Sequence, residues 1–294
     1  CPQELVDFET VLKKDLAKAG NEKRFAKDKK FWDDQLDALG EPLYSDIQGP
    51  SVLEGARKRH GDPKLRASDI EMNELFVAVK DYHLEPYATQ NLMDFCMNHQ
   101  LSMTNLLLLG IRTYLSKVNN GQEDITIQNF ISRRSTHDEW TSGGSRTIMF
   151  PCRTVISPET DFLSAAYEIQ NMQNRIYMHS NYDPALIVDE MRKRYHTPEH
   201  TSYESCYLTY QPMPVKVENE MLGTVRQHAK WFANGAATKK MYLTVSHTED
   251  GGMNFSYHYQ TAHLEEHDME LLYYYMMRIL FKGIAEPDMS IGEI

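Results

Sequence analysis

The sequence predicts a layered α/β domain with a mixed sheet, and three observations point to this class. Strand and helix patterns alternate from residue 70 onward, and strand patterns then cluster over residues 204–260. A wide apolar face over residues 103–118 indicates a deeply buried helix. Hydrophobic residues make up 41% and charged residues 25% of the 294 residues, a globular composition long enough to bury a sizeable core.

The first 40 residues are predicted to form two helices. Apolar residues recur at helical spacing over residues 5–16, and Gly20 is a suitable helix stop. The pattern repeats over residues 23–39 and ends at Gly40. Residues 41–68 are polar and rich in proline and glycine, which predicts an exposed connecting segment.

The later elements each follow from a local pattern. Ser102 is positioned to cap the helix that begins after it. Pro151 places its strand at a sheet edge or a bulge, because proline cannot donate a ladder hydrogen bond. The predicted strands are residues 74–79, 146–156 and 204–211, with a turn followed by a strand over 121–132 and a hairpin over 239–260. The predicted helices are residues 86–99, 103–118, 160–178, 184–194 and 264–282.

Charge and cysteine usage narrow the function classes. A net charge of −11 argues against broad binding to nucleic acid or to an anionic membrane. The richest apolar run, residues 106–111, is too short to cross a bilayer, and no signal peptide is visible, so a cytoplasmic location is expected. A start at Cys1 is compatible with a fragment of a longer protein. Cys1, Cys96, Cys152 and Cys206 are scattered, which predicts reduced thiols.

His247 raises the question of a catalytic base. It stands shortly before Asp250-Gly251, which is similar to the general base of acyl-transfer enzymes of the chloramphenicol-acetyltransferase type. Strand alternation places His247 on one face with Met241, Leu243 and Val245. Because Asp-Gly-Gly is typical of a tight hairpin turn, we interpret His247 as the last strand residue before that turn.

The remaining residues give no complete catalytic constellation. His196 and His200 are four apart, but Pro198 between them argues against a helix that would hold both imidazoles on one face. No nucleophile elbow, P-loop or dinucleotide fingerprint is present. We therefore predict no metal site and no catalytic residue within this chain.

Six stretches, in order, resemble the condensation domain of nonribosomal peptide synthetases. The stretch "RFAKDKKFWDDQL" resembles the family's Trp-containing helix, and the ending "EPDMSIGEI" is similar to its exit into the next domain. The stretch "GQEDITIQNFISRR" resembles a turn, a strand and a closing Gly-Arg, and Arg133 stands in place of that Gly. The residues that match this motif are Gly121, Gln122, Asp124 and Arg134.

Three further stretches complete the resemblance. "GSRTIMFPCR" is similar to a family strand and matches it at Gly144, Pro151 and Arg153, while Arg146, Ile148 and Met149 replace Phe, Asn and Thr. "HSNYDPALIVDEM" resembles the segment His-Gln-Asp-Tyr-Pro-Phe-Glu at His179 and Tyr182, with Asn181 in place of Asp. "SYESCYLTYQ" resembles a strand that ends in Tyr-Gln, here Tyr210 and Gln211.

The resemblance implies a fold and a reaction. In the family, two chloramphenicol-acetyltransferase-like lobes form a V around a tunnel, and carrier proteins deliver phosphopantetheine-tethered substrates from its two ends. An acceptor amine attacks a donor thioester. Residues 1–68 would be the helical linker and connecting segment from the N-terminal lobe, and residues 69–294 the C-terminal lobe. Arg153, Tyr210 and Gln211 are the candidates for the tunnel wall, and a structural salt bridge is the alternative role of Arg153.

The resemblance also implies that the catalytic motif lies outside this chain. The family's His-His-x-x-x-Asp-Gly motif lies upstream of the Trp-containing helix, and the residues before that helix contain no histidine here. We therefore expect this chain to be inactive alone and to bind no cofactor directly, with phosphopantetheine carried by partner proteins. The expected partners are the N-terminal lobe, peptidyl carrier proteins and an adenylation domain. Two alternatives stay open: a free-standing acyl-CoA acyltransferase with His247 as base, and a noncatalytic module that binds carrier proteins.

Overall fold

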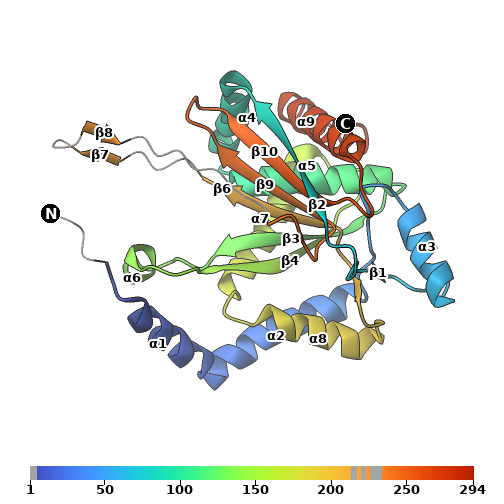
Figure 1. The fold of residues 1–294 in the computed structure, drawn as a ribbon, viewed down its shortest axis with the longest axis horizontal. Coiled ribbons are helices and arrows are strands. Elements are labelled where there is room, and N and C mark those ends of the chain that lie inside the picture. The colour runs from blue at the N-terminus through green and yellow to red at the C-terminus, as the bar shows by residue number, and fades with distance from the viewer. Residues whose placement is uncertain (1–4, 213–216, 220–222, 226–233) are drawn as a thin grey trace.

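The computed structural model describes residues 5–212, 217–219, 223–225 and 234–294. Most of them fold around one six-stranded sheet (Figure 1). The strands of this sheet are β2 (Val77–Leu84), β3 (Asp124–Ser132), β4 (Thr147–Val155), β6 (Cys206–Gln211), β9 (Met241–His247) and β10 (Met253–Gln260). Short strands form two further pairs, β1 (Ser68–Asp69) with β5 (Thr201–Ser202) and β7 (Val217–Asn219) with β8 (Gly223–Val225). The β7–β8 pair lies apart from the six-stranded sheet (Figure 1).

The helices lie where the periodic patterns predict them, with additions in the connecting segments. Their bounds are α1 (Phe8–Ala19), α2 (Glu22–Leu39), α3 (Ser51–His60), α4 (Pro86–Asn98), α5 (Met103–Val118), α6 (His137–Thr141), α7 (Phe162–Met178), α8 (Pro184–Tyr195) and α9 (Glu266–Ala285). The Ser102 side chain accepts a hydrogen bond from the amide of Asn105 at the start of α5, as the predicted cap requires. Gly20 and Gly40 follow the ends of α1 and α2.

The sheet is mixed, which confirms the predicted fold class. Its strand order is β2-β10-β9-β6-β3-β4. β6 runs parallel to both β3 and β9, and the remaining neighbours are antiparallel. β4 is an edge strand, as the presence of Pro151 predicts. Proline has no N–H group to donate, and an edge strand has one side on which no neighbouring strand needs that hydrogen bond.

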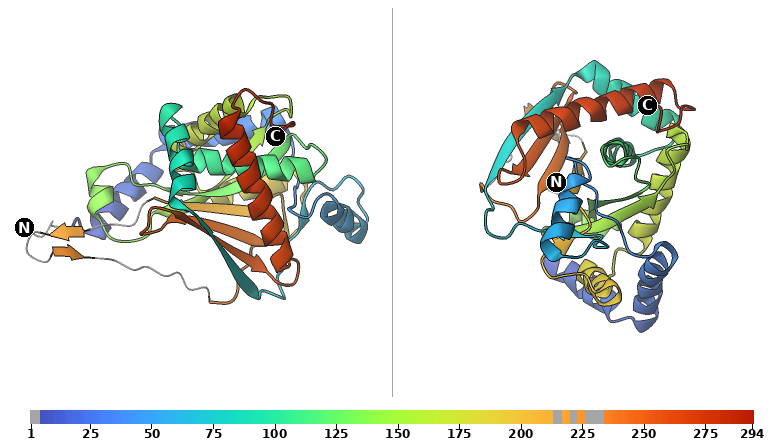
Figure 2. Two further views of the ribbon diagram at one scale, coloured as in Figure 1. Left: turned by 90° about the horizontal axis from the view of Figure 1, so that it is seen from above. Right: turned by 90° about the vertical axis from the view of Figure 1, so that its right-hand side faces the viewer.

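The core lies between the sheet and helices on one of its faces. In the right-hand view of Figure 2, α5 is seen end-on with α9 above it and α7 beside it. Leu106, Leu109 and Leu115 of α5 have no solvent exposure. Gly110 allows α9 to approach, because a Cβ there would lie 3.0 Å from Leu280. The predicted buried face of α5 is therefore confirmed.

The prediction of an exposed connecting segment at residues 41–68 is wrong. It contains α3, and Ala56 and Ala67 within it are fully buried. The Asp46 carboxylate is also buried, but it binds the Lys240 ammonium at 2.7 Å and the Tyr44 hydroxyl. Polar residues of this segment are buried because other elements satisfy their hydrogen bonds, which a local polarity pattern does not reveal.

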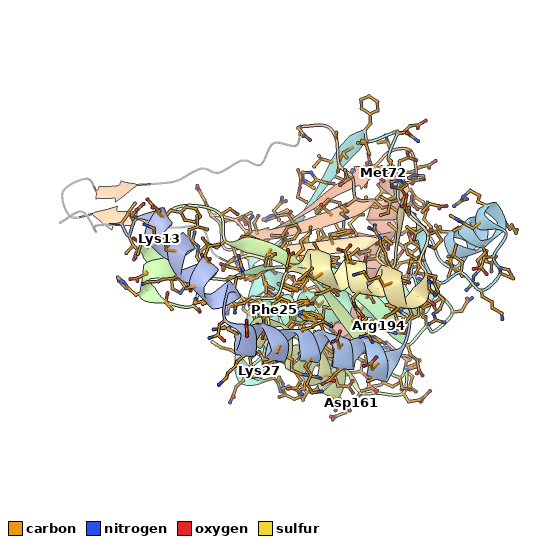
Figure 3. All side chains as sticks on the ribbon, turned by 90° about the horizontal axis from the view of Figure 1, so that it is seen from below. Lys13, Phe25, Lys27, Met72, Asp161 and Arg194 are labelled. Carbon is orange, nitrogen blue, oxygen red and sulfur yellow. The ribbon has the colours of Figure 1, made fainter. Side chains whose placement is uncertain are left out.

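Helix α2 packs against the β4 edge of the sheet and against α8. Figure 3 shows α2 beside α8, with Phe25 near the start of α2 and Arg194 on α8. The Arg194 guanidinium pairs with Asp33 of α2 at 3.0 Å and also with Asp37. On the other side of α2, the Trp32 ring stacks on Phe150 of β4 with centroids 5.6 Å apart. Helix α2 therefore belongs to the same core as the sheet.

A buried charged cluster fixes α1 to the segment that joins β3 and β4. The Arg146 guanidinium binds Asp15 of α1 at 2.6 Å and Glu139 at 3.2 Å, and its side chain is 4% exposed. Lys18 of α1 binds the same Glu139 carboxylate at 3.0 Å. Arg146 stands where the family pattern has phenylalanine, and Asp15 supplies the counter-charge that this replacement requires.

Glu139 predicts an acid-sensitive step in stability. Burial pushes its pKa up, but hydrogen bonds from Ser135, Thr136 and Lys18 outweigh burial and hold the pKa at about 2. A depressed folded-state pKa adds stability that is complete above the ordinary value of 4.5 and is lost as pH falls towards 2. We expect Glu139→Gln to lower the urea midpoint at pH 7, and expect this difference from the parent to shrink between pH 4.5 and 2. A difference that stays constant over that range would contradict the assignment.

Three cysteines are described, and all are buried free thiols, as predicted: Cys96, Cys152 and Cys206. Burial raises the pKa of each to about 12, so they are protonated and unreactive at neutral pH. Cys1 lies outside the described residues. Within the described part of the chain, no helix has the length and apolar character that crossing a bilayer needs.

Candidate functional site

A large cavity lies on the face of the sheet opposite the core helices. Its volume is about 1100 Å³, which is ample for a substrate group. Strand alternation sends one set of side chains to the core and the other set to this face, as in β9, where Leu243 and Val245 are buried and Tyr242 and Thr244 are half-buried. The strand side chains that line the cavity from this face include Phe130, Thr209, Gln211, Tyr242, Thr244 and His258.

Strand register explains why these residues meet. Thr209 of β6 pairs with Thr244 of β9, and His258 of β10 pairs with Tyr242. Tyr242 also stacks at an angle on Phe130 of β3, with ring centroids 6.1 Å apart. The cavity floor therefore combines two aromatic rings with hydroxyl groups from adjacent strands.

The two predicted tunnel residues of β6 both border this cavity but differ in direction. Gln211 alternates with Thr209 onto the cavity face, whereas Tyr210 packs against the core with Leu208. The Tyr210 hydroxyl lies 2.7 Å from Nε2 of His247. Burial raises the pKa of Tyr210 to about 12 and lowers the pKa of His247, so both are neutral at pH 7 and share one hydrogen bond.

His247 is the end of a strand, and the turn after it is held by its own polar groups. The Asp250 carboxylate accepts hydrogen bonds from the Thr248 hydroxyl and the Gly252 amide, and it pairs with His83 at 3.1 Å. Gly251 has a φ of +92°, which the tight turn requires and which a side chain would strain. The partner of the His247 imidazole is thus a phenol on the core side, and Asp250 serves the turn.

Arg153 lies away from the large cavity, at a small one of about 40 Å³ beside α2. Its guanidinium forms a two-pronged ion pair with Asp124 at 2.8 and 2.7 Å. It also donates to the carbonyls of Gly40 and Glu41, after the end of α2. These contacts are those of a structural salt bridge, the alternative role of Arg153, and contact with substrate stays a prediction.

The family-motif residues near β3 form turns and joints. Gly121 has a φ of +78° in the turn before β3, and the Gln122 amide donates to the carbonyl of Asp124 at 2.7 Å. The Arg134 guanidinium donates to the carbonyl of Gly144 at 2.8 Å. Gly144 has a φ of +83°, and a Cβ there would lie 2.5 Å from the Phe8 ring. These residues therefore set backbone geometry.

The motif residues after α7 join that helix to α2. Nδ1 of His179 lies 2.8 Å from the buried Asp28 carboxylate, and its ring stacks on Phe31 with centroids 4.3 Å apart. The Tyr182 ring lies 5.4 Å from that of Phe25. His179 and Tyr182 thus have packing roles at the end of a helix.

The arrangement of possible metal ligands is known for the described residues. Among the residues that the structure describes, no group of three or more His, Cys, Asp or Glu side chains is placed to hold a metal ion. His196 and His200 both have positive φ values, in the segment after α8 rather than on a helix.

Local patterns did not identify most of the cavity. Phe130, Tyr242, Thr244 and His258 were missed as a group, because they come from strands that are distant in sequence. The one available signal was alternation in β9, where Tyr242 and Thr244 fall opposite the apolar residues. Alternation shows that these side chains share a face, but it does not show which strands lie beside them.

Comparison with known proteins gives consistent matches. The family model described as the condensation domain matches residues 7–294. One of the plipastatin synthase subunits of Bacillus subtilis (strain 168) is 20% identical over 273 residues, which is 92% of this chain and 10% of that protein. Surfactin synthase subunit 1 of the same organism is 21% identical over 274 residues, which is 92% of this chain and 7% of that protein.

Solved structures show the same fold at low sequence identity. The first condensation domain of the CDA synthetase matches with a TM-score of 0.74 and 14% identity, over 100% of this chain and 58% of that chain. VibH, an NRPS condensation enzyme, matches with a TM-score of 0.70 and 12% identity, over 99% and 64%. The chain thus spans about three fifths of these structures and a tenth or less of the two synthases.

Proposed function

The chain belongs to the condensation-domain family, and on that premise we propose that it is the C-terminal lobe of a condensation domain in a nonribosomal peptide synthetase. Amide-bond formation is general to this family. In the intact domain, the cavity face of the sheet would form one wall of the reaction chamber. The observation that carries this proposal is the cavity of about 1100 Å³, which lies on a sheet face opposite the core helices.

The exposed leucine side chains of α1 support the proposal that a second lobe covers this helix. Val11, Asp15 and Lys18 of this helix face the rest of the chain, while Leu12 and Leu16 lie on its outer side. Leu12 and Leu16 are 44% and 64% exposed, and Leu5 before the helix is 71% exposed. Amphipathic helices normally bury the apolar side, so this arrangement fits a helix that a second lobe covers. The matched structures are longer than this chain, which leaves room for such a lobe.

The chemistry of the proposed reaction divides between the two lobes. The acceptor amine attacks the donor thioester carbonyl, the C–N bond forms, the C–S bond breaks, and the amine proton is taken up as the thiol leaves. Holding two tethered reactants in the right geometry supplies a large part of the rate. This lobe would contribute the wall that orients them, and the partner lobe would contribute the proton acceptor.

The test joins this chain to a condensation N-terminal lobe that carries His-His-x-x-x-Asp-Gly. We expect amide product from two carrier-tethered substrates with the joined protein and no product with this chain alone. His247→Ala in the joined protein should retain turnover within about threefold, because the imidazole bonds Tyr210 on the core side.

Tyr210→Phe is the matched control, since it removes the same hydrogen bond from the other partner. Loss of turnover with His247→Ala but not with Tyr210→Phe would favour a catalytic His247 and an acyltransferase reading. Carrier binding by the joined protein without any product would favour a noncatalytic binding module.

A further inference from the structure

The described lining of the large cavity carries no formal charge. Among the residues that the structure describes, its lining contains no Asp, Glu, Lys or Arg. Its polar groups are hydroxyls, amides and one imidazole, as in Thr244, Gln211 and His258, and its apolar groups include Phe130 and Leu75. Such a lining can accept hydrogen bonds and stack on rings, but it offers no counter-charge to a buried ion.

The titratable groups of the lining are neutral at physiological pH. Burial lowers the pKa of His258, and the nearby Asp81 of β2 only partly offsets this. Nε2 of His258 lies 3.3 Å from the Ser256 hydroxyl, a partner that does not require a charged ring. Burial also raises the pKa of Tyr242, so its phenol stays protonated. The described side chains of the lining are therefore uncharged at neutral pH.

The neighbouring cavity shows that this character is local. It has a volume of about 690 Å³, shares Thr238 with the large cavity, and is lined by Arg59, Asp69, Glu71 and Lys240 among others. Charged side chains are thus abundant next to the large cavity, yet its described lining excludes them. The separation is a property of the cavity, and the overall surface composition does not explain it.

We propose that this cavity binds the side chain of a thioester-linked aminoacyl group and selects for side chains without formal charge. The inference rests on the proposed function and adds the substrate class. A charged side chain would lose hydration on entry and find no opposite charge, which is costly. Amide, hydroxyl or aromatic side chains would find partners in Gln211, Thr209 or Tyr242.

The test uses stable pantetheine amides of four amino acids, with this chain and with the joined two-lobe protein, and measures binding by calorimetry. Glutamine is compared with glutamate, and norleucine with lysine, because each pair differs mainly in charge. All four probes carry the same α-amino group, so its contribution cancels. We expect each neutral probe to bind at least about tenfold more tightly than its charged counterpart.

Two variants locate the effect in the cavity. Thr244→Lys places a cation on its floor and should shift the glutamate-to-glutamine ratio at least about tenfold towards glutamate. Thr244→Met, of similar length and neutral, should leave the ratio unchanged. Equal binding of charged and neutral probes would overturn the selectivity while leaving the proposed function in place. If none of the four probes bound to the two-lobe protein, both the selectivity proposal and the proposed function would be contradicted.

Discussion

Replacing Trp32 with alanine is expected to lower the free energy of unfolding by about 3–5 kcal/mol, the range for truncating a large buried aromatic. The indole is 6% exposed, stacks on Phe150 at 5.6 Å and meets the Phe31 ring edge-on at 5.0 Å. It already borders a cavity of about 40 Å³, which truncation would enlarge. A shift of the urea midpoint with an unchanged slope measures this loss.

Trp32→Phe is the matched control. It keeps an aromatic ring against Phe150 and removes the indole Nε1, which is buried without a hydrogen-bond partner. Loss of an unsatisfied donor offsets part of the lost area, so we expect a cost below about 1.5 kcal/mol. Equal costs for the two variants would show that the stacking does not anchor α2.

Replacing Arg146 with methionine is expected to cost about 3 kcal/mol, near the lower end for breaking a buried ion pair. The substitution leaves Glu139, whose side chain is 5% exposed, with only Lys18 as counter-charge. It also leaves Asp15 without its bidentate partner, although Asp15 keeps some contact with water. The loss should appear both in the urea midpoint and in protease cleavage within α1.

Lys14→Met provides the control on the same helix. Lys14 pairs with Asp138, but both side chains are well exposed, so the expected cost is below about 1 kcal/mol. If Arg146→Met and Lys14→Met had the same small effect, the buried cluster would not be what holds α1 in place.

Sequence reasoning predicted elements better than contacts. Helical periodicity, the Ser102 cap and the glycine stops placed most of the helices, because these signals act within a few residues. It also placed the β9–β10 hairpin and identified its turn, since Asp250-Gly251-Gly252 is a local signal. These features depend on neighbours in the chain, which the sequence displays directly.

The errors have one physical cause. Residues 41–68 were predicted to be exposed because they are polar. Asp46 is nevertheless buried, because its carboxylate pairs with the ammonium group of Lys240, nearly 200 residues away in the chain. The cavity was missed for the same reason: β6 lies between β3 and β9, and no local pattern shows that order. Residues such as Tyr210 and Gln211 were found only through a resemblance that already encodes the sheet.

The order of the strands has a consequence for synthesis on the ribosome. β2 is the first strand of the sheet in the chain, yet within the sheet it pairs only with β10, whose last residue is Gln260. Until β10 has been synthesised and has left the exit tunnel, β2 has no strand to pair with in the sheet. A nascent chain therefore carries an unpaired hydrogen-bonding edge while residues 85–260 are being made, which makes products that stall in this interval prone to aggregate.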